Sequence, residues 1–201
     1  SPWPRISHIE AKEKYKSDKP DLRKDKSDSD ELAFAWIVDF PLFTEQSKDD
    51  FFYGSGSAKF APSHHMFTAP HPDDVKLLDT DPGKVRGLQH DLVLNGFEVG
   101  GGSIRIYKAE IQQKVFDLIG FSEEQKKDFD HILTAFTYGV PPHGGIAPGL
   151  DRFLMAVLGE PSVREVMAYP TTASGQTSVL DAPSAATDGQ LKELGIKVTS
   201  K

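Results

Sequence analysis

Two glycine-rich stretches carry charged side chains in patterns suited to binding phosphates and carboxylates. Residues 139–152 (GVPPHGGIAPGLDR) end in an arginine at the start of an apolar segment. Residues 91–105 (DLVLNGFEVGGGSIR) supply two carboxylates, three consecutive glycines and another arginine. Carboxylates hold Mg²⁺ together with phosphate oxygens, and a guanidinium binds oxyanions through paired hydrogen bonds. Together the two stretches predict a pocket that holds a nucleotide and a small zwitterion side by side.

The glycine triplet at 100–102 has two interpretations. It does not open a helix after a strand, so it matches neither a dinucleotide nor a phosphate-loop fingerprint. Glycines inside a strand let a ligand lie against the backbone, but they also mark bulges and close sheet packing. Glu98 and Arg105 bracket the triplet, and such charges are rarely buried without partners. Asp91, Glu98 and Arg105 alternate poorly across the intervening turn, so a surface ion pair remains the other interpretation.

Three further positions are candidates for ligand contact. Arg152 lies in the first turn of an apolar helix, where the helix dipole disfavours a cation, so it indicates contact with a base or phosphate. A salt bridge to Asp151 or to a neighbouring residue is the alternative. His64 and His65 lie together in a loop without a third metal ligand of convincing spacing, which leaves substrate contact or a solvated loop. Lys19 precedes a proline that holds it extended, and alone it indicates a charged loop.

Composition excludes several classes of protein. The chain has 201 residues, 38% hydrophobic and 26% charged, which suits one globular domain with a sizeable core. No apolar run approaches the roughly 18 residues of a membrane helix. A net charge of −7 argues against a broad surface for nucleic acid, so any such contact should be local. The absence of cysteine excludes disulfides and thiolate metal sites.

Periodicity and turn signals predict the elements that position these residues. The Asn95-Gly96 pair predicts a β-hairpin between strands 89–95 and 97–107. Ser7 and Ser122 sit at capping-box spacings, and glycines end several helices. Residues 44–63 are expected to form a mobile loop. The strands further include 33–40 and 143–148, and helices are expected at 5–16, around 111–119, from 122 to 138, at 150–158 (buried), near 162–166 and at 188–194. Because there is no regular βαβ alternation, the fold class is α+β, an antiparallel sheet flanked by helices.

Six segments in this order resemble the catalytic domain of class II aminoacyl-tRNA synthetases, and within them the aspartyl-tRNA synthetases of bacterial and mitochondrial type. The last three of these segments are highly specific. The related asparaginyl and lysyl enzymes share an arginine like that of GLDR but are not expected to share SDKPDLR or the histidine pair. The segments are YKSDKPDLR (15–23), FAWIVDFPLF (34–43), HHMFTAP (64–70), DLVLNGFEVGGGSIRIY (91–107), GVPPHGGIAPGLDR (139–152) and REVMAYPTTASGQTSVLDAPS (164–184).

The resemblance implies a nucleotide half of the pocket. Arg152 would stack on adenine and reach the γ-phosphate of ATP. Glu98, with Asp91 nearby, would hold Mg²⁺ and the phosphates. The floor of the pocket would be formed by Gly100, Gly101, Gly102 and Ser103.

It also implies an amino-acid half. Lys19 and Arg105 would clamp the side-chain carboxylate of L-aspartate and reject asparagine, whose neutral amide leaves charge unpaired. His64 and His65 would close over the amino acid. The α-carboxylate of aspartate would attack the α-phosphorus of ATP to give aspartyl-adenylate and pyrophosphate, and the aspartyl group would pass to the 3′ end of tRNA(Asp). No general base is needed, because a carboxylate is already a nucleophile, so positioning and electrostatics carry the catalysis.

The chain also departs from the family pattern. We expect residues 1–201 to be one partial catalytic domain, the C-terminal half, without the anticodon-binding domain. The first class II motif, which builds the homodimer interface, and the second, whose arginine binds the α-phosphate, are not found. A polar linker at 24–33 would replace an inserted domain. Pro148 stands where a small or apolar residue is more usual, and Gln89-His90 precede Asp91 where an aromatic residue is expected. The chain alone is therefore expected to be inactive or nearly so.

Compartment and competing functions complete the expectations. The run KVRGLQHDLVLNG (84–96) resembles mitochondrial-type members, which predicts the mitochondrial matrix, with the bacterial cytoplasm as the alternative. A non-catalytic paralogue or regulatory module that binds aspartate, adenylate or a protein partner is a second interpretation. A relative of asparagine synthetase, using the same adenylate chemistry with ammonia, is a third.

Overall fold

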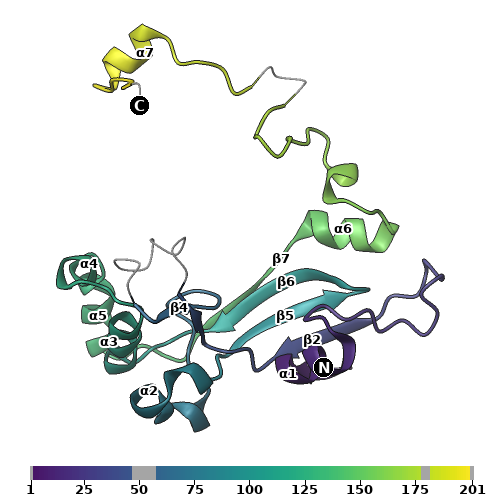
Figure 1. The fold of residues 1–201 in the computed structure, drawn as a ribbon, viewed down its shortest axis with the longest axis horizontal. Coiled ribbons are helices and arrows are strands. Elements are labelled where there is room, and N and C mark those ends of the chain that lie inside the picture. Colours follow the sequence, from purple (N-terminus) through teal and green to yellow (C-terminus); the bar gives the residue numbers. More distant parts are fainter. Residues whose placement is uncertain (1, 47–57, 178–181, 200–201) are drawn as a thin grey trace. The chain divides into compact units, whose positions relative to one another are not determined.

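The computed structural model describes residues 2–46, 58–177 and 182–199, which fall into two compact units, Ser1–Gly159 and Glu160–Lys201 (Figure 1). The larger unit holds every candidate residue from the sequence. The smaller unit contains a 3₁₀ turn, η3 (Val163–Val166), and a helix, α7 (Asp188–Glu193), as the sequence predicts. No helix in the described part of the chain is long and apolar enough to cross a membrane.

A five-stranded sheet forms the centre of the larger unit. The strands lie in the order β1 (Arg5–Ser7), β2 (Phe34–Val38), β5 (Gln89–Leu94), β6 (Phe97–Ile104) and β7 (Gly144–Pro148). Helices flank this sheet, so the α+β prediction is confirmed. One pair differs from the expectation, because β1 runs parallel to β2 while the other neighbours are antiparallel.

The N-terminal helix is shorter than predicted. Residues 5–7 form β1, because Ile6 is buried beside its partner Ile37 in the sheet. Helix α1 (His8–Tyr15) begins only after Ser7, whose hydroxyl accepts a hydrogen bond from the Glu10 amide at 3.2 Å. The cap is therefore confirmed, although the helix start was wrong by three residues.

The hairpin at Asn95-Gly96 is confirmed. Both residues have positive φ, 50° and 89°, which is the type I′ turn that suits the twist of a hairpin. A methyl group on Gly96 would lie 3.8 Å from the carbonyl oxygen of Lys19. The turn therefore packs directly on the segment that carries this lysine.

A β-bulge at Val99 changes which side chains share a face. Glu98 pairs with Val93, but the next residue of β5, Leu92, pairs with Gly100, so Val99 is the extra residue. A bulge of this kind reverses the inside–outside alternation beyond it. Glu98 therefore faces the same side of the sheet as Asp91, which the simple alternation of the sequence did not allow.

The two faces of the sheet are covered by different helices (Figure 1). On one, called the α1 face, Ala11 packs with Ala35, Ile37 and Val93. On the other, the α6 face, Ala156 of helix α6 (Leu150–Leu158) packs with Leu94 and Val99. The prediction of a buried α6 was wrong, because only Met155 and Ala156 are buried, whereas Leu150 is 77% exposed.

A second apolar cluster lies beside the sheet. Helix α3 (Ala109–Leu118) contributes Val115 and Phe116, which pack with Phe43 and Ile106. The helix expected after Ser122 is two helices, α4 (Glu123–Lys127) and α5 (Asp130–Thr137), although the capping box at Ser122 is confirmed. Shorter elements complete this region: β3 (Phe43–Glu45), β4 (Phe60–Pro62), η1 (Pro72–Asp74), α2 (Leu77–Thr80) and η2 (Pro82–Lys84).

The expected mobile loop at 44–63 is partly wrong. Its two ends pair as the antiparallel strands β3 and β4, because Phe43 and Ala61 are both buried. The middle of the expected loop, 47–57, lies outside the described residues.

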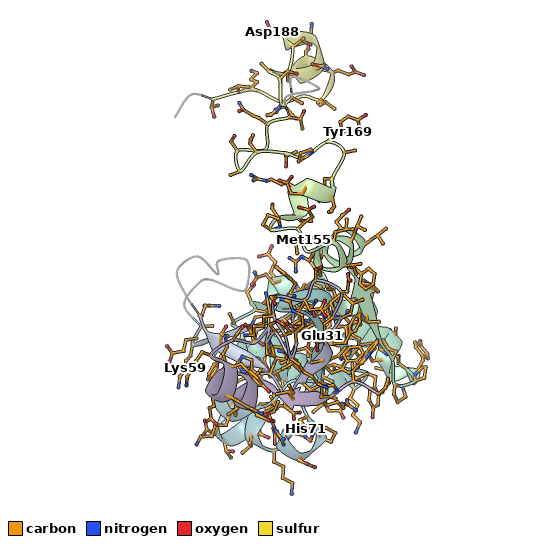
Figure 2. All side chains as sticks on the ribbon, turned by 90° about the vertical axis from the view of Figure 1, so that its right-hand side faces the viewer. Glu31, Lys59, His71, Met155, Tyr169 and Asp188 are labelled. Atoms are coloured by element: carbon orange, nitrogen blue, oxygen red, sulfur yellow. The ribbon has the colours of Figure 1, made fainter. Side chains whose placement is uncertain are left out.

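The predicted linker at 24–33 is an ordered polar loop. The Glu31 carboxylate, labelled in Figure 2, accepts hydrogen bonds from the backbone amides of Lys24 and Asp25 at 3.0 and 3.1 Å. The Asn95 side chain fastens the end of the loop, accepting from the Ala33 amide and donating to the Glu31 carbonyl, both at 2.9 Å. That the loop replaces an inserted domain stays a prediction.

Candidate functional site

Several of the candidate residues form a row on the α1 face. Along β6 come Glu98, Gly101 and Ser103, and Arg105 follows just beyond the strand. At about 3.3 Å per residue, the row from Glu98 to Arg105 extends over roughly 20 Å. We call Lys19, Asp91, Glu98 and Arg152 the carboxylate end, and His64, His65, Ser103 and Arg105 the histidine end.

Two carboxylates converge over a bare stretch of strand at the carboxylate end. A methyl group on Gly101 would lie 3.1 Å from Oδ1 of Asp91 and 3.3 Å from Oε1 of Glu98. Burial, and then the charge of Glu98, raise the pKa of Asp91 to about 6. The two acids therefore repel each other in a partly dry site, which is the electrostatic state that a cation relieves.

Two cations from distant segments reach the same oxygen of Glu98. Lys19 Nζ and Arg152 Nη1 each lie 3.4 Å from Oε2. The side chains of Lys19 and Arg152 are 42% and 56% exposed, so each pair contributes about 1 kcal/mol or less. Arg152 thus extends from the first turn of α6 to β6, and its partner in the ion pair is Glu98. Such weak pairs are easily exchanged for a ligand.

The donor set at this end fits Mg²⁺ that arrives with a phosphate ligand. Asp91 and Glu98 offer two carboxylates, and Gly101 leaves the space beside them free of a side chain. Within 2–46, 58–177 and 182–199, no three His, Cys, Asp or Glu side chains cluster into a metal site. Mg²⁺ commonly takes one or two carboxylates and completes its shell with water and phosphate oxygens. The protein therefore supplies part of a shell, as expected for a metal bound together with a nucleotide.

Hydrogen bonds, more than exposed ion pairs, organise the histidine end. Nη1 of Arg105 contacts both nitrogens of the His65 ring, Nε2 more closely than Nδ1, and the fully buried Ser103 places its hydroxyl 3.3 Å from Nε2 of the same ring. The His64 ring lies 4.5 Å from the His65 ring. The Phe67 amide also donates to Nδ1 of His65 at 3.1 Å. The imidazole of His65 is thus held from several sides.

His65 is neutral at physiological pH. Burial, and then the charge of Arg105, lower the pKa of His65 to about 4. Burial and Arg105 also lower the pKa of His64, while Glu98 acts in the opposite direction. A neutral ring can accept from Arg105, whereas an imidazolium would repel it. The guanidinium therefore keeps its positive charge available for an anionic ligand.

The structure separates some residues that the sequence groups together. Lys19 and Arg105, the expected clamp for one carboxylate, have different partners here, Glu98 and His65 respectively. Their shared role stays a prediction. A methyl group on Gly102 would lie 2.0 Å from the Gly145 carbonyl oxygen, and one on Gly100 would lie 3.3 Å from the Pro148 Cα. These two glycines permit close packing of β6 on β7, and only Gly101 faces the carboxylates.

Sequence reasoning missed the bulge that unites the site. A mismatch in alternation between Asp91 and Glu98, followed at once by a glycine triplet, was the available signal for it. The sequence also gave no sign of a cavity of about 530 Å³ that contains none of the candidate residues. Its walls include Arg5, Trp36, Val38, Asp39, His90 and Ile104.

Comparison with known proteins shows the family that the chain matches. The family model for class II tRNA synthetases (D, K and N) matches residues 1–173. An aspartate–tRNA(Asp/Asn) ligase of Rubrobacter xylanophilus is 49% identical over 173 residues, which are 86% of this chain and 28% of that protein. An aspartate–tRNA ligase of Parabacteroides distasonis is 47% identical over 175 residues, 87% of this chain and 28% of that protein. The chain therefore spans a little over a quarter of the length of these curated relatives.

Solved structures share the fold at lower identity. The aspartyl-tRNA synthetase of Entamoeba histolytica superposes with a TM-score of 0.57 at 22% identity, over 88% of this chain and 33% of that chain. The asparaginyl-tRNA synthetase of Pyrococcus horikoshii superposes with a TM-score of 0.55 at 21% identity, over 86% of this chain and 36% of that one. At these identities the superpositions show a shared fold alone.

Proposed function

Because the chain belongs to the class II tRNA synthetases (D, K and N), we propose that it is the part of an aspartate–tRNA ligase that binds aspartate and much of ATP. The complete protein would activate L-aspartate with ATP to aspartyl-adenylate and transfer the aspartyl group to the 3′ end of tRNA(Asp). The observation that carries the proposal is the row on the α1 face, where Glu98 lies between two cations and Arg105 lies beside a neutral His65. A ligand with a phosphate at one end and a carboxylate at the other fits this row.

The carboxylate end would receive ATP. Arg152 would exchange its exposed pair with Glu98 for adenine stacking and a γ-phosphate contact, at little energetic cost. Glu98 and Asp91 would hold Mg²⁺, which when bound neutralises phosphate charge. Gly101 lets the phosphates approach the backbone, because no side chain fills the space beside the two acids.

The histidine end would receive aspartate. Arg105 would pair with the side-chain carboxylate, with Lys19 as the second cation, and His64 and His65 would close over the amino acid. Ser103 supports His65 from the strand. A cation that is held in place and partly dry discriminates against a neutral amide, since asparagine would leave the charge unpaired. The aspartate α-carboxylate needs no base, so these residues act by positioning and by electrostatics.

Partners and compartment are part of the same proposal. The complete protein would act as a homodimer on ATP, L-aspartate and tRNA(Asp), with Mg²⁺ as cofactor. The mitochondrial matrix is the proposed compartment, with a bacterial cytoplasm as the alternative, and fractionation of source cells distinguishes the two. The α-phosphate arginine of the family is not found in this chain, so we expect little or no ATP–pyrophosphate exchange from the 201 residues alone.

Calorimetry with a non-hydrolysable aspartyl-adenylate analogue tests the proposal. The chain should bind this analogue, with Mg²⁺ increasing the affinity, and should bind the asparaginyl analogue at least about tenfold more weakly. No heat with either analogue, or equal affinity for both, would overturn it. Robust aspartate-dependent exchange by the chain would instead overturn only the expected inactivity.

A further inference from the structure

Two buried glutamines hold the segment that carries the histidine pair. Gln89 is 4% exposed and Gln112 is 0% exposed. Their side chains contact Ser63 and Met66, the residues immediately before and after the pair. Neither glutamine contacts a candidate site residue through its side-chain hydrogen bonds.

Gln112 fixes the downstream end of the pair. It lies on the inner face of α3, three and four residues before Val115 and Phe116, which are fully buried in the second apolar cluster. Its Nε2 donates a hydrogen bond of 2.9 Å to the carbonyl oxygen of Met66. The backbone directly after His65 is therefore held from the interior of the protein.

Gln89 fixes the upstream end. It lies on β5, opposite Ser103, on the α1 face. Its Nε2 donates to the hydroxyl of Ser63 at 2.7 Å and to the Pro41 carbonyl at 3.1 Å. The Ser63 amide also donates to the Leu42 carbonyl at 3.0 Å. The backbone directly before His64 is therefore held as well.

Stability alone does not account for these two side chains. Oε1 of each glutamine is buried and accepts no hydrogen bond from the described protein groups. A buried polar atom left in this state costs about 1–3 kcal/mol. Methionine has nearly the same volume without that cost. Buried polar groups of this kind call for another explanation, and the position of the histidine pair supplies one.

We propose that Gln89 and Gln112 are positioning residues that fix residues 63–66 at both ends, so that the His65 ring faces Arg105 and Ser103. The role of this geometry in aspartate binding rests on the proposed function, but the geometry itself does not. If either anchor is removed, the segment gains freedom and His65 moves away from the guanidinium. Among the described residues, the hydrogen bonds of the two anchor side chains involve no residue of the carboxylate end, which therefore keeps its geometry.

Gln112→Met, with Gln113→Met as the matched control, tests the geometry in the free chain. Gln113 is the exposed neighbour on the same helix. In Gln112→Met, histidine ring NMR should show the pKa of His65 moving from about 4 towards its ordinary value of 6.5. Gln113→Met should leave it unchanged. Identical His65 signals in wild type and Gln112→Met would overturn the inference, whether or not any ligand binds.

A binding measurement then connects the anchors to function. Gln112→Met should lose about tenfold or more in affinity for the aspartyl-adenylate analogue, while the affinity for ATP with Mg²⁺ should change less than twofold. Equal losses for both ligands would contradict a role confined to the histidine end. If wild type binds neither ligand but the His65 signals still shift, the proposed function fails and the positioning role stands. Gln89→Met repeats both measurements and decides the inference if Gln112→Met does not fold.

Discussion

The two ends of the candidate site are held together by different interactions, ion pairs at one and hydrogen bonds at the other. At the carboxylate end, segments far apart in sequence supply half-exposed cations, and the 3.4 Å pairs to Glu98 are weak. At the histidine end, Arg105, His65 and the buried Ser103 are joined by short-range hydrogen bonds beside one strand. Exposed charges rearrange around a ligand, whereas a hydrogen-bonded ring is already in place before it arrives. The difference indicates an adaptable carboxylate end and a preorganised histidine end.

Removing the central cation of the histidine end should produce the largest effect. Arg105→Ala should weaken binding of the aspartyl-adenylate analogue by about 3 kcal/mol, or about 100-fold, because a partly dry carboxylate loses its partner. Arg105→Lys keeps the charge without the planar fork and should recover only part of the loss. Calorimetry measures both variants. If Arg105→Ala binds the analogue as tightly as wild type does, Arg105 does not contact the aspartyl group.

Filling the space over the carboxylate end should produce the next effect. In Gly101→Ala the added methyl lies 3.1–3.3 Å from the two acids and blocks phosphate approach. We expect about tenfold weaker ATP binding with Mg²⁺, with the fold retained. Gly145→Ala is the control, because a methyl group there meets nothing within 4 Å. If Gly101→Ala binds ATP as wild type does, phosphates do not approach this part of β6.

Removing an exposed cation should have a smaller effect that depends on the ligand. Arg152→Ala should weaken ATP binding by about 1 kcal/mol while aspartate binding stays nearly constant, because its pair with Glu98 is solvent-screened. Titration calorimetry with each ligand separates the two. Arg164→Ala, at an exposed position of the smaller unit, serves as the control. Equal losses for ATP and aspartate would make Arg152 a structural residue and would erase the contrast between the ends.

Local signals predicted the parts of this fold whose geometry is set within a few residues. The Asn95-Gly96 turn and the Ser122 capping box depend on neighbouring φ values and side chains, and both are confirmed. The parallel pairing of β1 depends on Ile6 finding a partner some thirty residues away, which no local pattern contains. The shared face of Asp91 and Glu98 depends on a bulge, which shifts register without a unique sequence mark.

Charge in the sequence marks the residues of one end of the site more clearly than those of the other. Lys19, Glu98 and Arg152 meet through ion pairs, which charge alone makes plausible. The supports of the histidine end are the neutral side chains Gln89 and Gln112, which in sequence resemble ordinary surface residues. Only their burial in the structure distinguishes them. A preorganised region is therefore harder to read from sequence than an adaptable one.

The smallest expected net effect is the dependence of stability on pH, because the contributions of the two ends oppose each other. The folded protein raises the pKa of Asp91 to about 6, so its stabilising contribution is complete below pH 3.8 and is lost as pH rises through 6. It lowers the pKa of His65 from 6.5 to about 4, so that contribution is complete above pH 6.5 and is lost as pH falls through 4. Between pH 4 and 6.5 the two ends therefore change stability in opposite directions and partly cancel.

Single substitutions should reveal how each of the two groups changes the stability with pH. Asp91→Asn leaves only the pH-dependent contribution of His65. The urea concentration at half-unfolding should therefore fall more steeply than in wild type on acidification from pH 6.5 to 4. His65→Asn leaves only the pH-dependent contribution of Asp91, so the urea concentration at half-unfolding should fall less steeply than in wild type. Other groups, such as Asp74 with its pKa lowered to about 2 beside Arg86, are common to all three proteins and cancel in the comparison. Parallel curves of stability against pH for the three proteins would mean that neither pKa is shifted by its end of the site. The physical contrast between the ends would then rest on geometry alone.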